Sequence, residues 1–152
     1  MAPLIILLGT FVILFLLDRA FLGRRFGVSL MGRISLSAML FATGISHFWS
    51  TDLLVEIMPE AVPFKREIVY FTGICELLAI PGLLWTKTAR LTSIVLVIFF
   101  LAILPANIVG SLKQVQLGGM EYGAMYLLFR VPLQMFFILW VWFFGVRRSN
   151  YA

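Results

Sequence analysis

Charged residues are scarce in this chain of 152 residues. Only 12% of the residues are charged, whereas a typical soluble domain carries about a quarter, and 62% are hydrophobic. The apolar residues also stand in long uninterrupted runs, which excludes an ordinary water-soluble globule. No hydrophilic linker divides the chain, so we expect one compact unit whose main partner is the lipid bilayer.

Cysteine and histidine each occur only once, as Cys75 and His47. A single cysteine excludes an internal disulfide and any CxxC dithiol chemistry. A single histidine, without HExxH spacing, argues against a metal or haem centre built from this chain alone. We therefore expect no metal site, and no cofactor that the chain holds by itself.

Acidic residues are fewer than basic ones, seven against twelve, which gives a net charge of +5. In a soluble protein this balance would favour a nucleic-acid partner. Here the basic residues flank the apolar runs, as topology signals do, and no basic patch is interleaved with aromatic residues. We expect no nucleic-acid partner.

The apolar runs predict five transmembrane helices, at about residues 3–22, 31–49, 68–85, 91–112 and 123–146. The first has no basic segment before it and no clear cleavage site after it, which favours a retained helix over a signal peptide. The segment between the second and third spans is too polar to cross and resembles an amphipathic interfacial helix. The expected fold is all-α, a polytopic membrane helical bundle.

Prolines interrupt two of the expected spans. Pro81-Gly82 should kink or end the third span, and Pro105 should break the fourth. The second span is rich in serine, alanine and glycine, and small residues let helix backbones approach closely in lipid. We therefore expect it to lie at the centre of the bundle.

Basic loops remain in the cytoplasm, so the basic residues also predict an orientation. The loops after the first and third spans and the C-terminus carry the following basic residues: Arg19, Arg24, Arg25, Arg33, Lys87, Arg90, Arg147 and Arg148. The other loops are acidic or nearly neutral. The pattern predicts an N-terminus outside and a C-terminus in the cytoplasm, in what we expect to be a bacterial inner membrane.

Glu76 and Arg130 are charged residues within apolar spans, where ionisable groups are costly and indicate function by default. Helical rise places Glu76 about 13 Å and Arg130 about 12 Å below the outer boundary. At matched depth the two are expected to form an ion pair. That pair would have either a functional role or a purely structural one that sets helix register.

Three further polar residues are expected in the same outer half of the bundle. Gln134 lies one turn after Arg130 on the same face, while His47 and Asn107 lie near the outer boundary. His47 and Glu76 are candidates for proton transfer, because histidine titrates near neutral pH. Asn107 is expected to satisfy backbone groups at the Pro105 break, and Cys75 to serve packing. Together they predict an outer-half polar cluster: His47, Glu76, Asn107, Arg130 and Gln134.

Six short motifs make residues 31–146 resemble the DoxX-like family of small membrane proteins. They are His47-Phe48, Met58-Pro59, Gly73-x-x-Glu76, Gly82-Leu83-Leu84, Pro105-Ala106-Asn107 and Arg130-x-Pro132-x-Gln134. The resemblance implies a four-helix membrane domain over residues 31–148. Residues 1–30 then form an additional N-terminal transmembrane helix and a basic cytoplasmic loop.

The resemblance is compatible with two functions. Family members associated with quinol and thiosulfate oxidation imply a redox-associated membrane subunit that binds a quinone-type or other small apolar ligand in an outer-half pocket. Because no residue here carries electrons, a membrane oxidoreductase partner or a cofactor would have to supply that chemistry. The alternative is a non-enzymatic scaffold or assembly chaperone for other membrane proteins. Both functions are compatible with a homo-oligomer.

Overall fold

The computed structural model describes residues 2–147, and every regular element among them is helical. The elements are α1 (Ala2–Ala20), α2 (Val28–Trp49), α3 (Thr51–Glu56), α4 (Lys65–Leu84), α5 (Thr86–Ala102), α6 (Leu104–Leu112), the 3-10 helix η1 (Met120–Tyr122), α7 (Ala124–Val141) and the π-helix η2 (Trp142–Arg147). Arg148, one of the predicted cytoplasmic residues, lies outside the described part.

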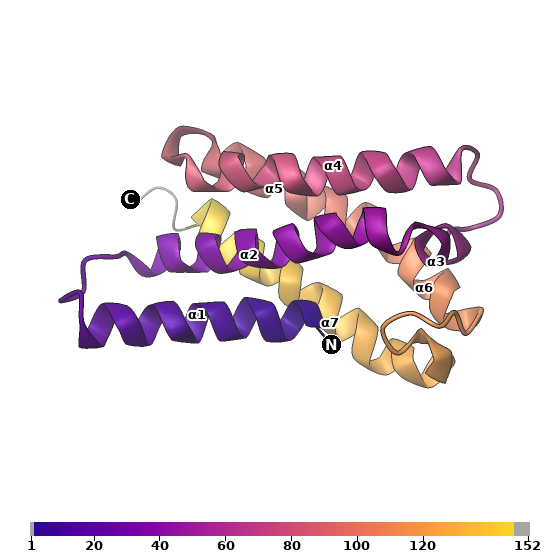
Figure 1. Ribbon diagram of the computed structural model, residues 1–152, viewed down its shortest axis with the longest axis horizontal. Helices are drawn as coiled ribbons and strands as arrows, with labels where there is room; N and C mark the ends of the chain where they lie inside the picture. Colours follow the sequence, from indigo (N-terminus) through magenta and orange to yellow (C-terminus); the bar gives the residue numbers. More distant parts are fainter. Residues whose placement is uncertain (1, 148–152) are drawn as a thin grey trace.

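Five helical segments are long and apolar enough to cross a bilayer, which confirms the predicted polytopic membrane bundle. α5 and α6 together form the fourth segment, and α7 continues through η2 to form the fifth. Their lengths suit a hydrocarbon core of about 30 Å. In Figure 1, α1 runs along α2 and α2 runs along α4, with α5 and α7 completing the bundle. α2 is the most buried segment, as its small residues predicted.

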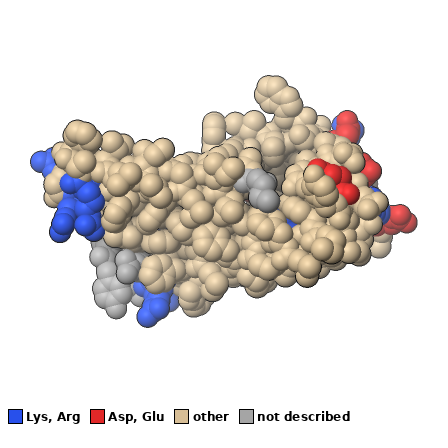
Figure 2. Space-filling view, turned by 90° about the horizontal axis from the view of Figure 1, so that it is seen from below, with Lys and Arg blue, Asp and Glu red and all other residues tan. Residues whose placement is uncertain are grey.

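Charge divides the bundle into two different ends (Figure 2). The basic end holds the turns after α1 and α4 and the end of η2, with Arg19, Arg24, Arg25, Lys87, Arg90 and Arg147. The acidic end holds α3, the start of α4 and the turns around η1, where five acidic residues outnumber three basic ones: Asp52, Glu56, Glu60, Glu67 and Glu121 against Lys65, Arg66 and Lys113. Exposed aromatic side chains mark both boundaries, including Trp49 at the acidic end and Trp85 at the basic end, as is typical of membrane interfaces.

Arg33 does not lie in the basic loop to which the sequence assigned it. It belongs to the second turn of α2, is only 1% exposed, and donates from Nη1 to the carbonyl of Leu83 at 3.4 Å. The last carbonyls of a helix have no donor within that helix. Arg33 therefore caps the end of α4, next to Gly82, whose carbonyl accepts from the Thr88 hydroxyl.

The two proline positions behave differently. α4 continues past Pro81 and ends three residues later, at Leu84. At Pro105 the fourth span breaks, because α5 ends at Ala102 and α6 begins at Leu104. Gln134 of α7 satisfies the break by donating from Nε2 to the Phe100 carbonyl at 2.8 Å. The sequence had assigned this role to Asn107, whose side chain instead contacts Arg130.

A glycine pair sets how closely α2 and α4 approach. A Cβ atom added to Gly73 would lie 2.6 Å from His47 Cβ and 3.1 Å from the Gly44 carbonyl oxygen. A Cβ atom added to Gly44 would lie 3.3 Å from the Gly73 carbonyl oxygen. Both helices therefore need a residue without a side chain at their crossing, which is the use of small residues in membrane packing.

Gly73→Ala should destabilise the protein, because its new methyl group meets the His47 Cβ atom and cannot be accommodated by rotating a flexible side chain. We expect a loss of about 1–3 kcal/mol, as for other overpacked positions. Gly9→Ala is the matched control, since a Cβ atom at Gly9 of α1 meets nothing within 4 Å. Thermal unfolding in detergent measures both variants. Equal stability of the two would contradict the close crossing.

Candidate functional site

His47 and Glu76 form a buried ion pair where α2 crosses α4. The His47 Nε2 atom lies 3.5 Å from Glu76 Oε1, and the two side chains are 15% and 6% exposed. The second carboxylate oxygen of Glu76 accepts a short hydrogen bond from the Thr43 hydroxyl of α2. Both oxygens of a carboxylate that the sequence placed in an apolar run thus have partners on one neighbouring helix.

The histidine ring is held by its other nitrogen. Nδ1 of His47 lies 2.9 Å from the Val69 carbonyl oxygen and 3.2 Å from the Thr72 hydroxyl. A carbonyl oxygen can only accept, so Nδ1 carries the proton and Nε2 is the nitrogen that faces Glu76. This leaves Nε2 as the atom that exchanges a proton with the carboxylate.

Arg130, Asn107 and Gln134 form a second polar cluster, between α7 and the α5–α6 pair. Arg130 donates from Nη2 to Asn107 Oδ1 at 2.8 Å, and Asn107 is only 4% exposed. One turn before Arg130, the Tyr126 hydroxyl donates to the Gly118 carbonyl at 2.6 Å. Tyr126, Arg130 and Gln134 are spaced by four residues and so follow one face of α7.

The predicted ion pair between Glu76 and Arg130 is wrong. Among residues 2–147, the ion pair of Glu76 is with His47, and no ion pair includes Arg130. The physical reason is the arrangement of helices: α4 packs against α2, α3 and α5, whereas α7 packs mainly against α5, α6 and η2. Helical rise gives a residue's depth but not the direction in which its helix faces. The five residues of the predicted cluster thus divide into two sites.

Sequence reasoning missed two residues of the candidate site, Thr43 and Thr72. Each precedes an ionisable partner by four residues, Thr43 before His47 and Thr72 before Glu76. That spacing puts a hydroxyl and an ionisable group on one face of each helix. The repeated spacing could have identified the site, and it also explains why each threonine contacts the ionisable residue of the opposite helix.

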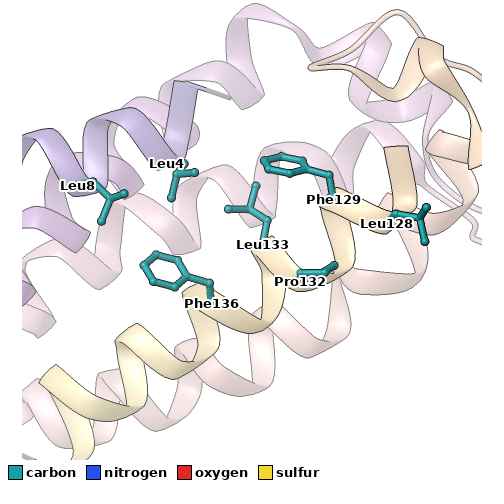
Figure 3. A pocket seen from close by; sticks show the side chains of 7 residues that line it. All are labelled: Leu4, Leu8, Leu128, Phe129, Pro132, Leu133 and Phe136. Atoms are coloured by element: carbon teal, nitrogen blue, oxygen red, sulfur yellow. The ribbon is translucent and has the colours of Figure 1, made fainter. Parts of the chain in front are cut away.

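An apolar groove of about 370 Å³ separates α1 from α7. In Figure 3, Leu4 and Leu8 of α1 face Phe129, Leu133 and Phe136 of α7 across it. All its lining side chains are apolar, so it can hold a hydrocarbon chain and offers no polar side chain to a headgroup. The groove lies between α1 and α7, whereas His47 and Glu76 belong to α2 and α4.

One free thiol lies next to the site, whereas no metal-ligand group is found. Within residues 2–147 no three His, Cys, Asp or Glu side chains gather into a group that could hold a metal ion. Cys75 is a half-buried free thiol one residue before Glu76. The side chains in mutual contact at the α2–α4 crossing are the imidazole, the carboxylate and the two threonine hydroxyls.

Double-mutant cycles should separate the observed pair from the one that the sequence predicted. We expect His47→Gln and Glu76→Gln to show a coupling free energy of roughly 0.5–3 kcal/mol, because residues in contact couple in this range. Glu76→Gln and Arg130→Met should add to within about 0.5 kcal/mol, as independent sites do. Unfolding of the single and double variants in detergent provides both values. Strong coupling in the second cycle would instead support an ion pair between Glu76 and Arg130.

A family described as a domain of unknown function (DUF8561) matches residues 36–145, which covers α3 to α7 and most of α2 and leaves α1 outside the match. No curated protein and no solved structure matches the chain. The matched region holds both polar clusters. The chain belongs to the DUF8561 family.

Proposed function

We propose that this integral membrane protein is a DoxX-like, redox-associated subunit that binds a quinone-type ligand at the acidic end. The observation that carries the proposal is the buried His47–Glu76 pair, since ionisable groups within a membrane helix are costly and usually serve function. A bound quinone would supply the two-electron chemistry, with electrons from a membrane oxidoreductase partner. What this chain supplies is a place to accept and release protons.

The pair suits proton exchange with a ligand. His47 Nδ1 is held by the Val69 carbonyl, which leaves Nε2 to pass a proton to or from Glu76. Thr43 holds the opposite carboxylate oxygen and so orients Glu76 towards the imidazole. A general acid or base needs this kind of fixed geometry and a pKa near the working pH, and an imidazole has such a pKa in its unperturbed state.

His47 is the residue that would contact the ligand, and Glu76 would act through it. The His47 side chain is 15% exposed and lies two residues from the end of α2, whereas the Glu76 side chain is 6% exposed and deeper in α4. Phe48, the residue after His47, stacks on Tyr70 of α4 with ring centroids 5.7 Å apart. A planar apolar head fits beside such rings.

Ubiquinone or menaquinone added in detergent should raise the unfolding temperature of the wild type. Glu76→Gln should abolish that rise, because the imidazole loses its ionised partner. Glu67→Gln is the matched control, since it makes the same chemical change at an exposed position of α4. A rise that persists in Glu76→Gln, or no rise with either quinone, would contradict the proposal.

The orientation of the protein in the membrane is inferred from the charged residues at the two ends of the bundle. We propose that the basic end faces the cytoplasm of a bacterial inner membrane and that the acidic end faces outward, since retained loops are the basic ones. The N-terminal end of α1 and the His47–Glu76 pair then lie towards the outer side. Protons would exchange with the outer aqueous phase.

The alternative function is a scaffold or assembly factor for other membrane proteins. The observation that favours it is the exposure of α1, which packs against α2 and leaves most of its surface towards lipid, with Ile5 67% and Ile13 59% exposed. This function predicts that a defined membrane partner copurifies in mild detergent. Ile13→Trp should disrupt that association, and Glu76→Gln should leave it intact.

A further inference from the structure

Arg130 carries a positive charge inside the bundle without a carboxylate to balance it. No ion pair among residues 2–147 includes Arg130, although Lys113 and Arg66 at the same end each pair with an acidic residue. Its described neighbours are a neutral amide, Asn107, and a neutral phenol, Tyr126. An unbalanced charge at such a position is costly, which favours binding of an anion.

Two hydrogen-bond donors of this site also lack acceptors. Within the described residues, Nε of Arg130 and Nδ2 of Asn107 are buried and make no hydrogen bond. The amide orientation of Asn107 is fixed, because its oxygen accepts from Arg130 Nη2, and turning the amide over would set donor against donor. A buried donor without an acceptor destabilises the folded state. Each of these two nitrogen atoms therefore needs a hydrogen-bond acceptor that the described residues do not supply.

Two backbone carbonyls near this face of α7 already accept hydrogen bonds. The Gly118 carbonyl accepts from the Tyr126 hydroxyl, and the Phe100 carbonyl at the helix break accepts from Gln134. The site therefore combines a guanidinium with an amide NH2 group, and the acceptor that Tyr126 offers to Arg130 is a hydroxyl oxygen, not a carboxylate. Arginine binds phosphate oxygens through several N–H groups at once, and such charge-assisted bonds are the strong ones.

We propose that Arg130 and Asn107 form a binding site for a phosphate oxyanion, presented by a lipid headgroup or by free phosphate. The site is separate from the His47–Glu76 pair and does not depend on the proposed quinone function. Arg130 lies six residues into α7, about 9 Å along the helix from Ala124. A long arginine side chain can extend from there towards the headgroup region.

The acidic end distinguishes the two sources of phosphate. The acidic residues at this end outnumber the basic ones, although Asp52 and Glu60 are paired with Arg66 and Lys113. The remaining negative charge repels a free anion within about 10 Å at moderate salt. A lipid headgroup would reach the site from within the membrane and avoid part of that repulsion, so the lipid source should bind at lower concentration than free phosphate does.

Asn107→Asp is the decisive variant. It keeps the shape of the side chain and gives Arg130 an internal counter-ion in place of the amide. The variant should be at least as stable as the wild type without phosphate, and it should lose phosphate binding by about tenfold or more, as expected for a charge-assisted hydrogen bond. Lys113→Gln removes an exposed positive charge at the same end and should leave binding unchanged.

The test uses the full chain in a maltoside detergent, which contains no phosphate. Inorganic phosphate at constant ionic strength, phosphatidylglycerol and diacylglycerol are compared by thermal unfolding. We expect phosphatidylglycerol to raise the unfolding temperature of the wild type by roughly 2–4 °C or more, and diacylglycerol to have no effect. A response to inorganic phosphate as well would identify the oxyanion itself as sufficient.

Two results would overturn the proposal. One is the absence of stabilisation by both phosphate sources in the wild type. The other is stabilisation of Asn107→Asp equal to that of the wild type, which would place the binding elsewhere. Arg130→Met provides a second check, because it removes the charge while keeping the length of the side chain, and it should also lose the response. Whether quinone stabilises the protein does not affect the interpretation of these phosphate experiments.

Discussion

The close crossing of α2 and α4 is the constraint on which the rest of the structure depends. Gly44 and Gly73 face each other there, with no room for a side chain on either. That approach brings His47 onto the Val69 carbonyl and Glu76 onto the Thr43 hydroxyl. A wider crossing would leave a carboxylate in hydrocarbon without partners, at a cost of a few kcal/mol or more. The packing of small residues and the pairing of ionisable ones are thus one feature.

Two further intramembrane polar side chains are bonded to a neighbouring helix. Arg33 of α2 caps the last turn of α4, and Gln134 of α7 satisfies the backbone at the α5–α6 break. Such bonds hold helices together where the hydrophobic effect does not operate between them. Among the described residues three buried side-chain donors have no acceptor, one on Arg33 and two at the Arg130–Asn107 site. The pairing of two such donors at one site is why we assign that site a ligand.

The fold could be predicted from the sequence because it depends on the length and composition of each apolar segment. Apolar length gave the five spans, the small residues of the second gave its central position, and Pro105 gave the helix break. The pairing of polar residues could not be predicted in this way, because depth says nothing about which face of a helix meets which neighbour. Arg33 was assigned to a loop for a related reason. The second span was predicted to begin at residue 31, so Arg33 resembled a basic residue at the membrane boundary. In the structure α2 begins at Val28, which places Arg33 inside the helix. The spacing of Thr43 and Thr72 was available in the sequence and points to the correct pair.

The central claim is that His47 and Glu76 act as a coupled pair with the Nδ1 proton held by Val69. His47 is the only histidine in the chain, so ¹⁵N-histidine labelling gives one imidazole to observe by solid-state NMR in lipid bilayers, with protein prepared without a histidine tag. We expect an imidazole that keeps its Nδ1 proton across neutral pH, with an Nε2 resonance that titrates and whose midpoint shifts in Glu76→Gln. An imidazole protonated only at Nε2, or a titration unchanged by Glu76→Gln, would contradict it.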